Sequence, residues 1–206
     1  MIRSRQIVLA SSSPRRAELL RQIGIRFETV PAEVDEWQRP GEGAEAYVLR
    51  LAGIKATTVA ERLHDLAARD VPVLGADTTV RLEGRLLGKP ADLSEAREML
   101  RALSGRAHEV LTAVAVAAVR GGQVECRAAL SRSRVWLRQL NVDEVDAYCR
   151  TAEPFDKAGA YGIQGIAGIF VDRIEGSYSG IMGLPLPEAE VLLSAFGVNT
   201  WQYRGA

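Results

Sequence analysis

Cysteine and histidine are scarce in this chain. Among 206 residues there are two cysteines, Cys126 and Cys149, and two histidines, His64 and His108. A structural zinc site needs a cluster of Cys and His ligands, so we expect none here. Cysteines that stand alone, with no C-x-x-C spacing, are typical of a reducing compartment, because disulfide frameworks form in oxidising ones.

The chain also lacks an excess of charge of either sign. Lys and Arg together number 26, and Asp and Glu together number 26. No net charge therefore draws the chain to nucleic acid or to an anionic membrane. No apolar run reaches membrane-spanning length, and Ile7–Ala10 is too short for the hydrophobic part of a secretory signal. We expect a cytoplasmic protein whose anion sites are local clusters of cations.

Strand-like and helix-like patterns alternate along the chain, which predicts an α/β fold. Neither an internal repeat nor a low-complexity linker marks a boundary, so residues 1–206 are expected to form a single domain. Helices are predicted at Pro14–Ile23, Ala44–Leu66, Ser94–Leu103, Val142–Arg150 and from Pro187 to near Gly197. Strands are predicted at Ile7–Ala10, Phe27–Val30, Val71–Ala76, Glu109–Val119, Val124–Leu137 and Ile169–Ile174, with a hairpin at Thr79–Leu87.

The first candidate site is the turn Ser11-Ser12-Ser13-Pro14-Arg15-Arg16. Ser13 suits a helix N-cap and Pro14 suits the first helical position. A helix N-terminus favours anions, so two arginines there suggest that a negative ligand such as phosphate lies between them and the free N–H groups. The alternative is an ordinary capped helix with surface arginines.

Asp77 and Lys55 are the next candidates. Asp77 follows the apolar run Val71–Ala76, and a carboxylate at the end of a buried strand is held rigidly enough to act as a general base or metal ligand. It could instead cap the turn that follows. Lys55 shares a helix face with apolar residues, so its ammonium extends either to solvent or into a site.

Three loops carry further polar candidates. Asp35 and Glu36 offer oxygen ligands to a hard divalent cation, although most acidic loop pairs are simply solvated. Lys89 lies in Gly88-Lys89-Pro90 after the expected hairpin. The run Asp156–Gly165 sets a charged pair beside glycines that allow close approach of a ligand, and its alternative is a mobile loop.

In this order and spacing, the segments resemble the Maf family of nucleoside triphosphate pyrophosphatases. The resemblance runs from Leu9 to about Pro185. It implies an α/β fold with a mixed central sheet, flanking helices and two lobes around a long cleft, related to the inosine triphosphatase fold. It also implies hydrolysis of a nucleoside triphosphate to the monophosphate and pyrophosphate, with Mg²⁺ or Mn²⁺. Thr78 and the run Ala160–Gly165 resemble the branch that acts on dTTP and UTP, and modified pyrimidine triphosphates fit the same reading.

The resemblance also implies a role for each candidate. Asp77 would be the general base, and Asp35 and Glu36 would hold the metal. The phosphates would be bound by Ser11, Ser13, Arg16, Lys55, Lys89 and Lys157. Arg15, Thr78 and Gln164 would select the base, because an amide such as that of Gln164 can pair with the carbonyl and N3–H edge that thymine and uracil share.

Other functions stay open from sequence alone. The same scaffold could act on purine or methylated nucleotides, although Thr78 and Gln164 argue against it. The family's link to septum formation suggests a nucleotide-dependent regulator that binds a cell-division partner, and a nucleotide-binding module without turnover is a further alternative. The oligomeric state is also open, with a homodimer as the candidate assembly.

Overall fold

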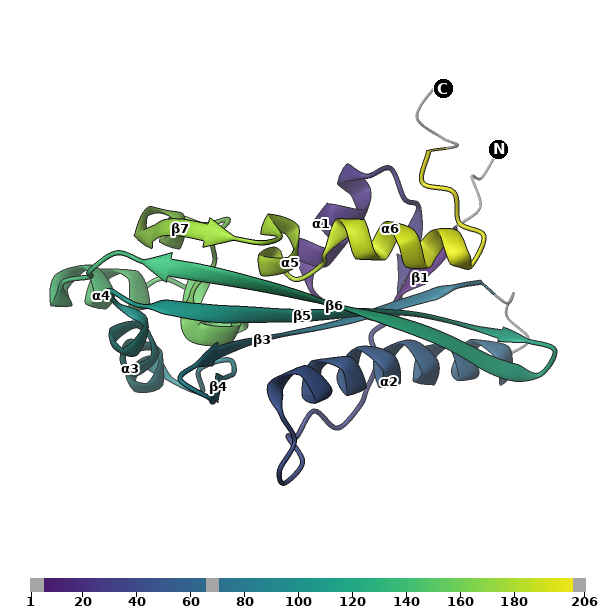
Figure 1. The fold of residues 1–206 in the computed structure, drawn as a ribbon, viewed down its shortest axis with the longest axis horizontal. Coiled ribbons are helices and arrows are strands. Elements are labelled where there is room, and N and C mark those ends of the chain that lie inside the picture. The colour runs from purple at the N-terminus through teal and green to yellow at the C-terminus, as the bar shows by residue number, and fades with distance from the viewer. Residues whose placement is uncertain (1–5, 66–70, 202–206) are drawn as a thin grey trace. The chain divides into compact units, whose positions relative to one another are not determined.

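A computed structural model describes residues 6–65 and 71–201 (Figure 1). The chain divides into two compact units, each described by itself below. Unit 1 comprises Met1–Asp77, Thr112–Leu130 and Gly183–Ala206, and unit 2 comprises Thr78–Leu111 and Ser131–Met182. Within the described ranges, every helix is too short or too polar to cross a membrane.

The strands form one mixed sheet in the order β2-β1-β3-β5-β6-β7, with β4 paired to β3. Strand β1 is parallel to both β2 and β3, whereas β4 is antiparallel to β3 and β7 is antiparallel to β6. The predicted mixed central sheet with flanking helices is therefore confirmed. The strands are β1 (Ile7–Leu9), β2 (Phe27–Thr29), β3 (Val73–Leu82), β4 (Arg85–Leu87), β5 (Ala107–Arg120), β6 (Gln123–Leu137) and β7 (Val171–Glu175).

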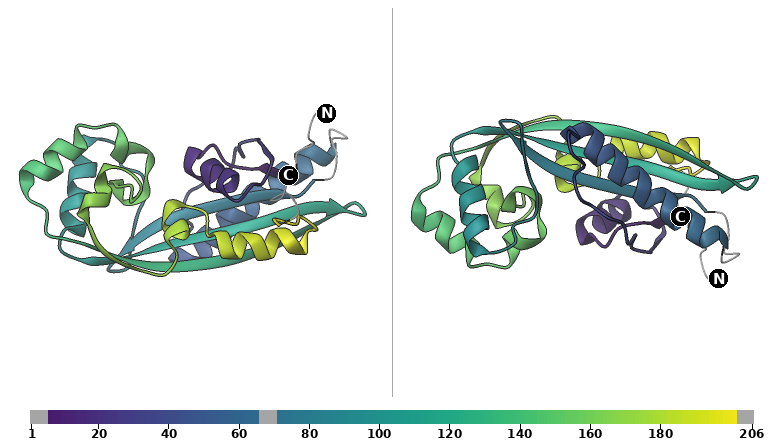
Figure 2. Two further views of the ribbon diagram at one scale, coloured as in Figure 1. Left: turned by 90° about the horizontal axis from the view of Figure 1, so that it is seen from above. Right: turned by 90° about the horizontal axis from the view of Figure 1, so that it is seen from below.

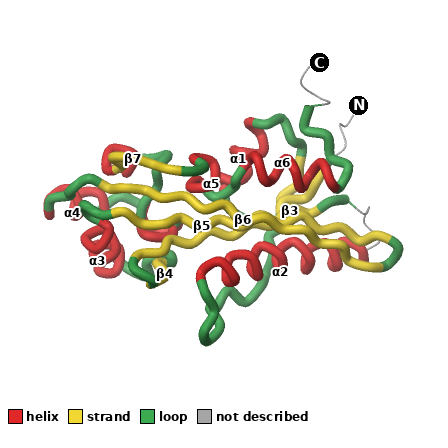
Figure 3. Tube along the Cα trace, in the orientation of Figure 1, coloured by secondary structure: helices red, strands yellow, loops and turns green. Residues whose placement is uncertain are grey.

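Unit 1 contains the helices α1 (Pro14–Gln22), α2 (Ala44–Asp65) and α6 (Leu186–Ala195). Leu20 of α1, Leu51 of α2 and Leu193 of α6 are fully buried, so all three helices contribute to the core. The predicted end of the second helix at Leu66 lies outside the described residues. The chain between β2 and α2 forms neither helix nor strand, as its Pro and Gly content predicts. Figure 3 shows its last part as the green loop that leads into α2.

Unit 2 contains α3 (Leu93–Leu103), α4 (Val142–Cys149), α5 (Tyr178–Met182) and three short 3₁₀ turns at Glu153–Asp156, Ala158–Ala160 and Ile166–Phe170. Helices α3 and α4 lie side by side (Figure 2) and are joined by an ion pair between Arg97 and Asp146. Their apolar faces belong to one hydrophobic cluster in this unit.

The sequence predicts that Asn141 with Glu144 caps the helix that follows and that Gly121-Gly122 joins two long strands, and both predictions are confirmed. Asn141 and Glu144 form a reciprocal capping box at the start of α4. Gly121 and Gly122 both have positive φ, which the turn between β5 and β6 requires. The short helix α5 was not predicted, because its sequence Tyr-Ser-Gly-Ile-Met has no helical apolar repeat.

Gly75 sets how closely α2 approaches β3. A Cβ atom at this position would lie 2.5 Å from the backbone oxygen of Ala52 and 2.8 Å from the backbone nitrogen of Ala56. Both neighbours are helix backbone, which cannot rotate away as a side chain can. Glycine at position 75 therefore allows the close packing that brings Lys55 of α2 and Asp77 of β3 together.

Candidate active site

A buried ion pair joins Lys55 and Asp77 in unit 1. The Lys55 ammonium donates to Asp77 Oδ1 at 2.7 Å, and each residue is 7 % exposed. Lys55 thus turns into the protein rather than extending to solvent, which decides between the two alternatives for this lysine. Burying a charge costs free energy unless the charge is paired. Lys55 and Asp77 therefore stabilise each other's charged form.

The expected position of Asp77 at the end of a strand was wrong. Strand β3 continues from Val73 to Leu82 without interruption, and Asp77 lies in its middle. The residues that follow, Thr78, Thr79 and Val80, are β-branched and favour continued extension over a turn. Regular strand therefore flanks Asp77 on both sides, so Asp77 does not cap a turn.

The environment shifts the pKa values of two site residues in opposite directions. Burial raises the pKa of the Asp77 carboxyl, and the positive charges of Lys55 and Arg16 offset part of this rise. Burial lowers the pKa of the Arg16 guanidinium, and the negative charge of Asp77 raises it again in part. A carboxylate with a raised pKa is a better proton acceptor, which is the property a general base needs.

The turn before α1 brings Ser11 and Arg16 together. Arg16 Nη1 donates to Ser11 Oγ at 3.0 Å, and Arg16 Nε donates to the carbonyl oxygen of Gly183 at 2.8 Å. The predicted N-cap position of Ser13 is confirmed, but without the usual side-chain hydrogen bond. The backbone N–H of Ser13 donates to Ser11 Oγ at 3.2 Å.

Arg15 lies beside Arg16 in the first turn of α1 and is half-buried. Its positive charge contributes to the lowered pKa of Arg16. Two guanidinium groups are thus held close to each other at a helix N-terminus, where an anion is favoured.

The structure separates the two acidic loop residues. Glu36 Oε1 lies 2.7 Å from the Lys55 ammonium, so this carboxylate joins the central ion pair. Asp35 Oδ1 instead accepts a hydrogen bond from the backbone N–H of Trp37 at 3.0 Å. Glu36 extends into the site, whereas Asp35 stabilises the local turn.

The carboxylates around Lys55 suit a metal shared with phosphate groups rather than a metal cage made by the protein alone. Across residues 6–65 and 71–201, no group of three or more His, Cys, Asp or Glu side chains could form a metal cage. Mg²⁺ is commonly held by one or two carboxylates together with substrate phosphates. Glu36 and Asp77 both reach the same ammonium nitrogen, so two carboxylates converge there and fit such a metal.

The four remaining candidates, Thr78, Lys89, Lys157 and Gln164, belong to unit 2. Lys157 donates to the carbonyl oxygen of Glu153 at 2.7 Å and pairs with Asp156 Oδ1 at 2.5 Å. A Cβ on Gly162 would collide with the Lys157 side chain, so this glycine lets the chain pass close to the lysine. Lys89 and Gln164 are exposed.

The sequence does not indicate two groups that contact predicted site residues, the Tyr47 hydroxyl and the carbonyl oxygen of Gly183. It also does not indicate Arg50 and Glu42, which bond to each other and, through Arg50, to the loop that carries Glu36. Tyr47 and Arg50 are three residues apart on α2 and so share a helix face, but nothing in the sequence indicates which loop that face contacts. Burial and the carboxylates of Asp77 and Glu36 raise the pKa of Tyr47 to about 12, so its hydroxyl stays protonated as a donor.

Comparison with known proteins places this chain in a family. Residues 6–196 match the family described as Maf-like protein, and the chain therefore belongs to the Maf family. A "dTTP/UTP pyrophosphatase" of Hahella chejuensis is 52% identical over 197 residues, covering 96% of this chain and 95% of that protein. A "dTTP/UTP pyrophosphatase" of Methylobacillus flagellatus is 54% identical over 193 residues, covering 94% of each chain.

A solved structure of the Staphylococcus aureus Ham1 protein has a TM-score of 0.44 and 15% identity to this chain. The match covers 92% of this chain and 96% of that chain.

Proposed function

We propose that this chain hydrolyses pyrimidine nucleoside triphosphates, with dTTP, UTP and modified pyrimidine triphosphates as its substrates. The observation that carries the proposal is the buried Asp77 carboxylate, paired with Lys55 and sharing that ammonium with Glu36. Relatives about half identical over nearly the whole chain bear the name dTTP/UTP pyrophosphatase, which supports the choice of substrate. Residues 1–206 act as one Maf-like domain in this proposal.

In the proposed reaction, a water oxygen bonds to the α-phosphorus and one proton of that water passes to the Asp77 carboxylate. The bond between the α-phosphorus and the oxygen bridging to the β-phosphorus breaks, releasing the monophosphate and pyrophosphate. Lys55 and Arg16 stabilise the charge that develops on the phosphate oxygens. Ser11 and Ser13 assist as hydrogen-bond partners at the same turn.

A divalent cation, Mg²⁺ or Mn²⁺, supplies positive charge to the phosphate chain when it is bound. Glu36 is the proposed protein ligand, and Asp35 orders the loop that presents it. Lys89 and Lys157 are proposed to bind phosphate, and Arg15, Thr78 and Gln164 to select the base.

The test is pyrophosphate release from a panel of ordinary and modified triphosphates, with and without added metal. We expect release from dTTP and UTP, and loss of turnover with retained nucleotide binding in Asp77→Asn. Near wild-type turnover in Asp77→Asn would overturn the general-base role. Nucleotide binding without release from any triphosphate would favour a binding module, and a regulator that needs a protein partner would behave in the same way.

A further inference from the structure

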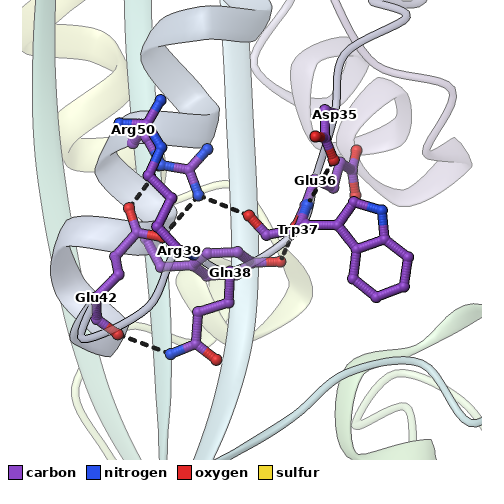
Figure 4. Close-up of polar contacts among 8 residues, drawn as sticks. Asp35, Glu36, Trp37, Gln38, Arg39, Glu42 and Arg50 are labelled. Carbon is purple, nitrogen blue, oxygen red and sulfur yellow. Dashed lines mark hydrogen bonds and ion pairs between the residues drawn. The ribbon is translucent and has the colours of Figure 1, made fainter.

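Two side chains of α2 hold the backbone of the loop that carries Glu36 (Figure 4). The Tyr47 hydroxyl donates to the carbonyl oxygen of Glu36 at 3.0 Å. Arg50 Nη2 donates to the carbonyl oxygen of Trp37, also at 3.0 Å. Because two consecutive carbonyl groups are bonded to one helix face, the backbone from which the Glu36 side chain extends is held against α2.

Glu42 orients the guanidinium of Arg50. Arg50 Nε lies 2.6 Å from Glu42 Oε1, and Nη2 lies 2.7 Å from Glu42 Oε2, so the contact is bidentate. The side chains of Arg50 and Glu42 are 14% and 9% exposed. The hydrogen bond to Arg50 lowers the pKa of Glu42 to about 2, so this carboxylate is ionised at neutral pH.

Glu42 also closes the loop on itself. Its Oε2 accepts from the backbone N–H of Arg39 at 3.0 Å, and its carbonyl oxygen accepts from Gln38 Nε2 at 2.7 Å. Trp37 lies between these contacts and Glu36, and in Figure 4 its indole points away from the Glu42–Arg50 pair. Trp37 is 84% exposed, so the loop is held by polar contacts to its backbone rather than by burial of its aromatic residue.

We propose that Glu42 and Arg50 are positioning residues that hold Glu36 against Lys55. The inference rests on the proposed function, in which Glu36 acts at the phosphate chain. Arg50 Nη2 bonds to both Glu42 and the Trp37 carbonyl, and the planar fork of arginine makes these contacts together with the Nε bond. Lysine at position 50 keeps the charge but has a single nitrogen, so it cannot reproduce this geometry.

The first arm of the test measures the loop without catalysis. Trp136→Phe and Trp201→Phe leave Trp37 as the only tryptophan of the chain. Adding Arg50→Lys should lower the fluorescence anisotropy of Trp37, because its carbonyl loses a fixed partner. The matched control is Asp146→Asn, which removes the 2.7 Å ion pair with Arg97 in unit 2 and should leave the anisotropy unchanged. Unchanged anisotropy in Arg50→Lys would overturn the proposal.

The second arm asks whether Glu42 acts through Glu36. Glu42→Gln should lower kcat/KM about tenfold in the otherwise unchanged protein, since small misplacements of catalytic groups are costly. In a Glu36→Gln background the same change should lower kcat/KM less than about twofold, because coupled residues are non-additive. Equal losses in both backgrounds would contradict the proposal. If the unchanged protein releases no pyrophosphate, the proposed function fails instead, and the anisotropy arm still decides whether Arg50 holds the loop.

Discussion

The ammonium of Lys55 lies 2.7 Å from Asp77 and 2.7 Å from Glu36, so one buried cation joins two carboxylates. Asp77 comes from the middle of β3 and is nearly as buried as the lysine, whereas the Glu36 side chain comes from a loop and is 53% exposed. Lys55 therefore links a rigid carboxylate to a more accessible one, and its removal should affect both.

Lys55→Met should shift the pH dependence of hydrolysis. The Lys55 charge lowers the pKa of Asp77 against the effect of burial, so without it that pKa rises further. Asp77 must be ionised to accept a proton, so the acidic limb of kcat/KM should move to higher pH. Arg62→Met on the same helix is the control, because Arg62 is exposed and donates to the carbonyl oxygen of Pro31 at 3.3 Å. If the acidic limb of the kcat/KM profile does not shift in Lys55→Met, Asp77 is not the general base.

The two acidic loop residues should differ in their effect on metal binding. Glu36→Gln removes the carboxylate that reaches Lys55, and Mn²⁺ affinity in the presence of nucleotide should fall about tenfold or more. Asp35→Asn keeps an oxygen that can accept from the Trp37 N–H, so its effect should be several times smaller. Electron paramagnetic resonance of free Mn²⁺ measures both affinities directly. A larger loss in Asp35→Asn would reverse the assignment.

Gln164→Ala should mainly weaken the discrimination between bases. The amide offers a donor and an acceptor to the edge that thymine and uracil share, and cytosine presents the reversed pattern. We expect the ratio of kcat/KM for UTP over CTP to fall by about tenfold or more while kcat for UTP changes little. Pyrophosphate release with each nucleotide alone gives the ratio. A uniform loss for all nucleotides would assign Gln164 a role other than base selection.

His108 should make the protein less stable in mild acid. Its Nε2 lies 2.6 Å from the Tyr161 hydroxyl, and its buried Nδ1 has no hydrogen-bond partner among the described residues. Burial lowers the pKa of His108 to about 4 from an ordinary value of 6.5. The unfolded chain binds a proton more readily in this interval, so stability falls as pH decreases from 6.5 toward 4, by on the order of 3 kcal/mol.

Urea unfolding at several pH values measures this effect. His108→Gln replaces the imidazole with an amide that does not titrate and that can still bond to Tyr161, so its stability should change less across the interval. His64→Gln is the matched control, because His64 is exposed near the end of α2 and its replacement should leave the pH dependence as in the wild type. Equal slopes for all three proteins would contradict the prediction.

Two neighbouring glycines should respond to alanine with opposite signs. Gly75→Ala places a Cβ within 2.8 Å of two backbone atoms of α2 and should cost about 1–3 kcal/mol of stability. Gly53→Ala lies within α2, where a Cβ meets nothing within 4 Å, and should add about 1 kcal/mol through helix propensity. Thermal unfolding of the two variants gives the comparison. A stabilising Gly75→Ala would mean that α2 does not pack this closely on β3.

How much of this structure can be predicted from the sequence depends on how far apart in the chain the interacting residues lie. The capping box of Asn141 and Glu144 and the turn at Gly121 and Gly122 depend on a few consecutive residues, and the sequence predicted both. The apolar run before Asp77 predicts a strand that ends at Ala76, but the strand continues to Leu82. The β-branched residues Thr78, Thr79 and Val80 favour extended backbone and account for the difference.

The candidate site was only partly predictable for a different reason. The residue types at Ser11, Arg16, Lys55 and Asp77 indicate phosphate chemistry, but their partners depend on the path of the whole chain. The Glu42–Arg50 contact joins a loop to a helix, and no periodicity in the sequence reports it. The separation of Asp35 from Glu36 likewise depends on the loop path, since two adjacent acids are equivalent by composition.

The bond between Arg16 and the Gly183 carbonyl has a consequence for synthesis of the protein. The two residues are 167 positions apart, and unit 1 is assembled from three separate stretches of the chain. A ribosome that has made Arg16 must add 167 further residues before this partner exists. Until Gly183 has been made, the guanidinium of Arg16 lacks this bond, so nascent chains that end before Gly183 should bind nucleotide more weakly if Arg16 binds phosphate as proposed.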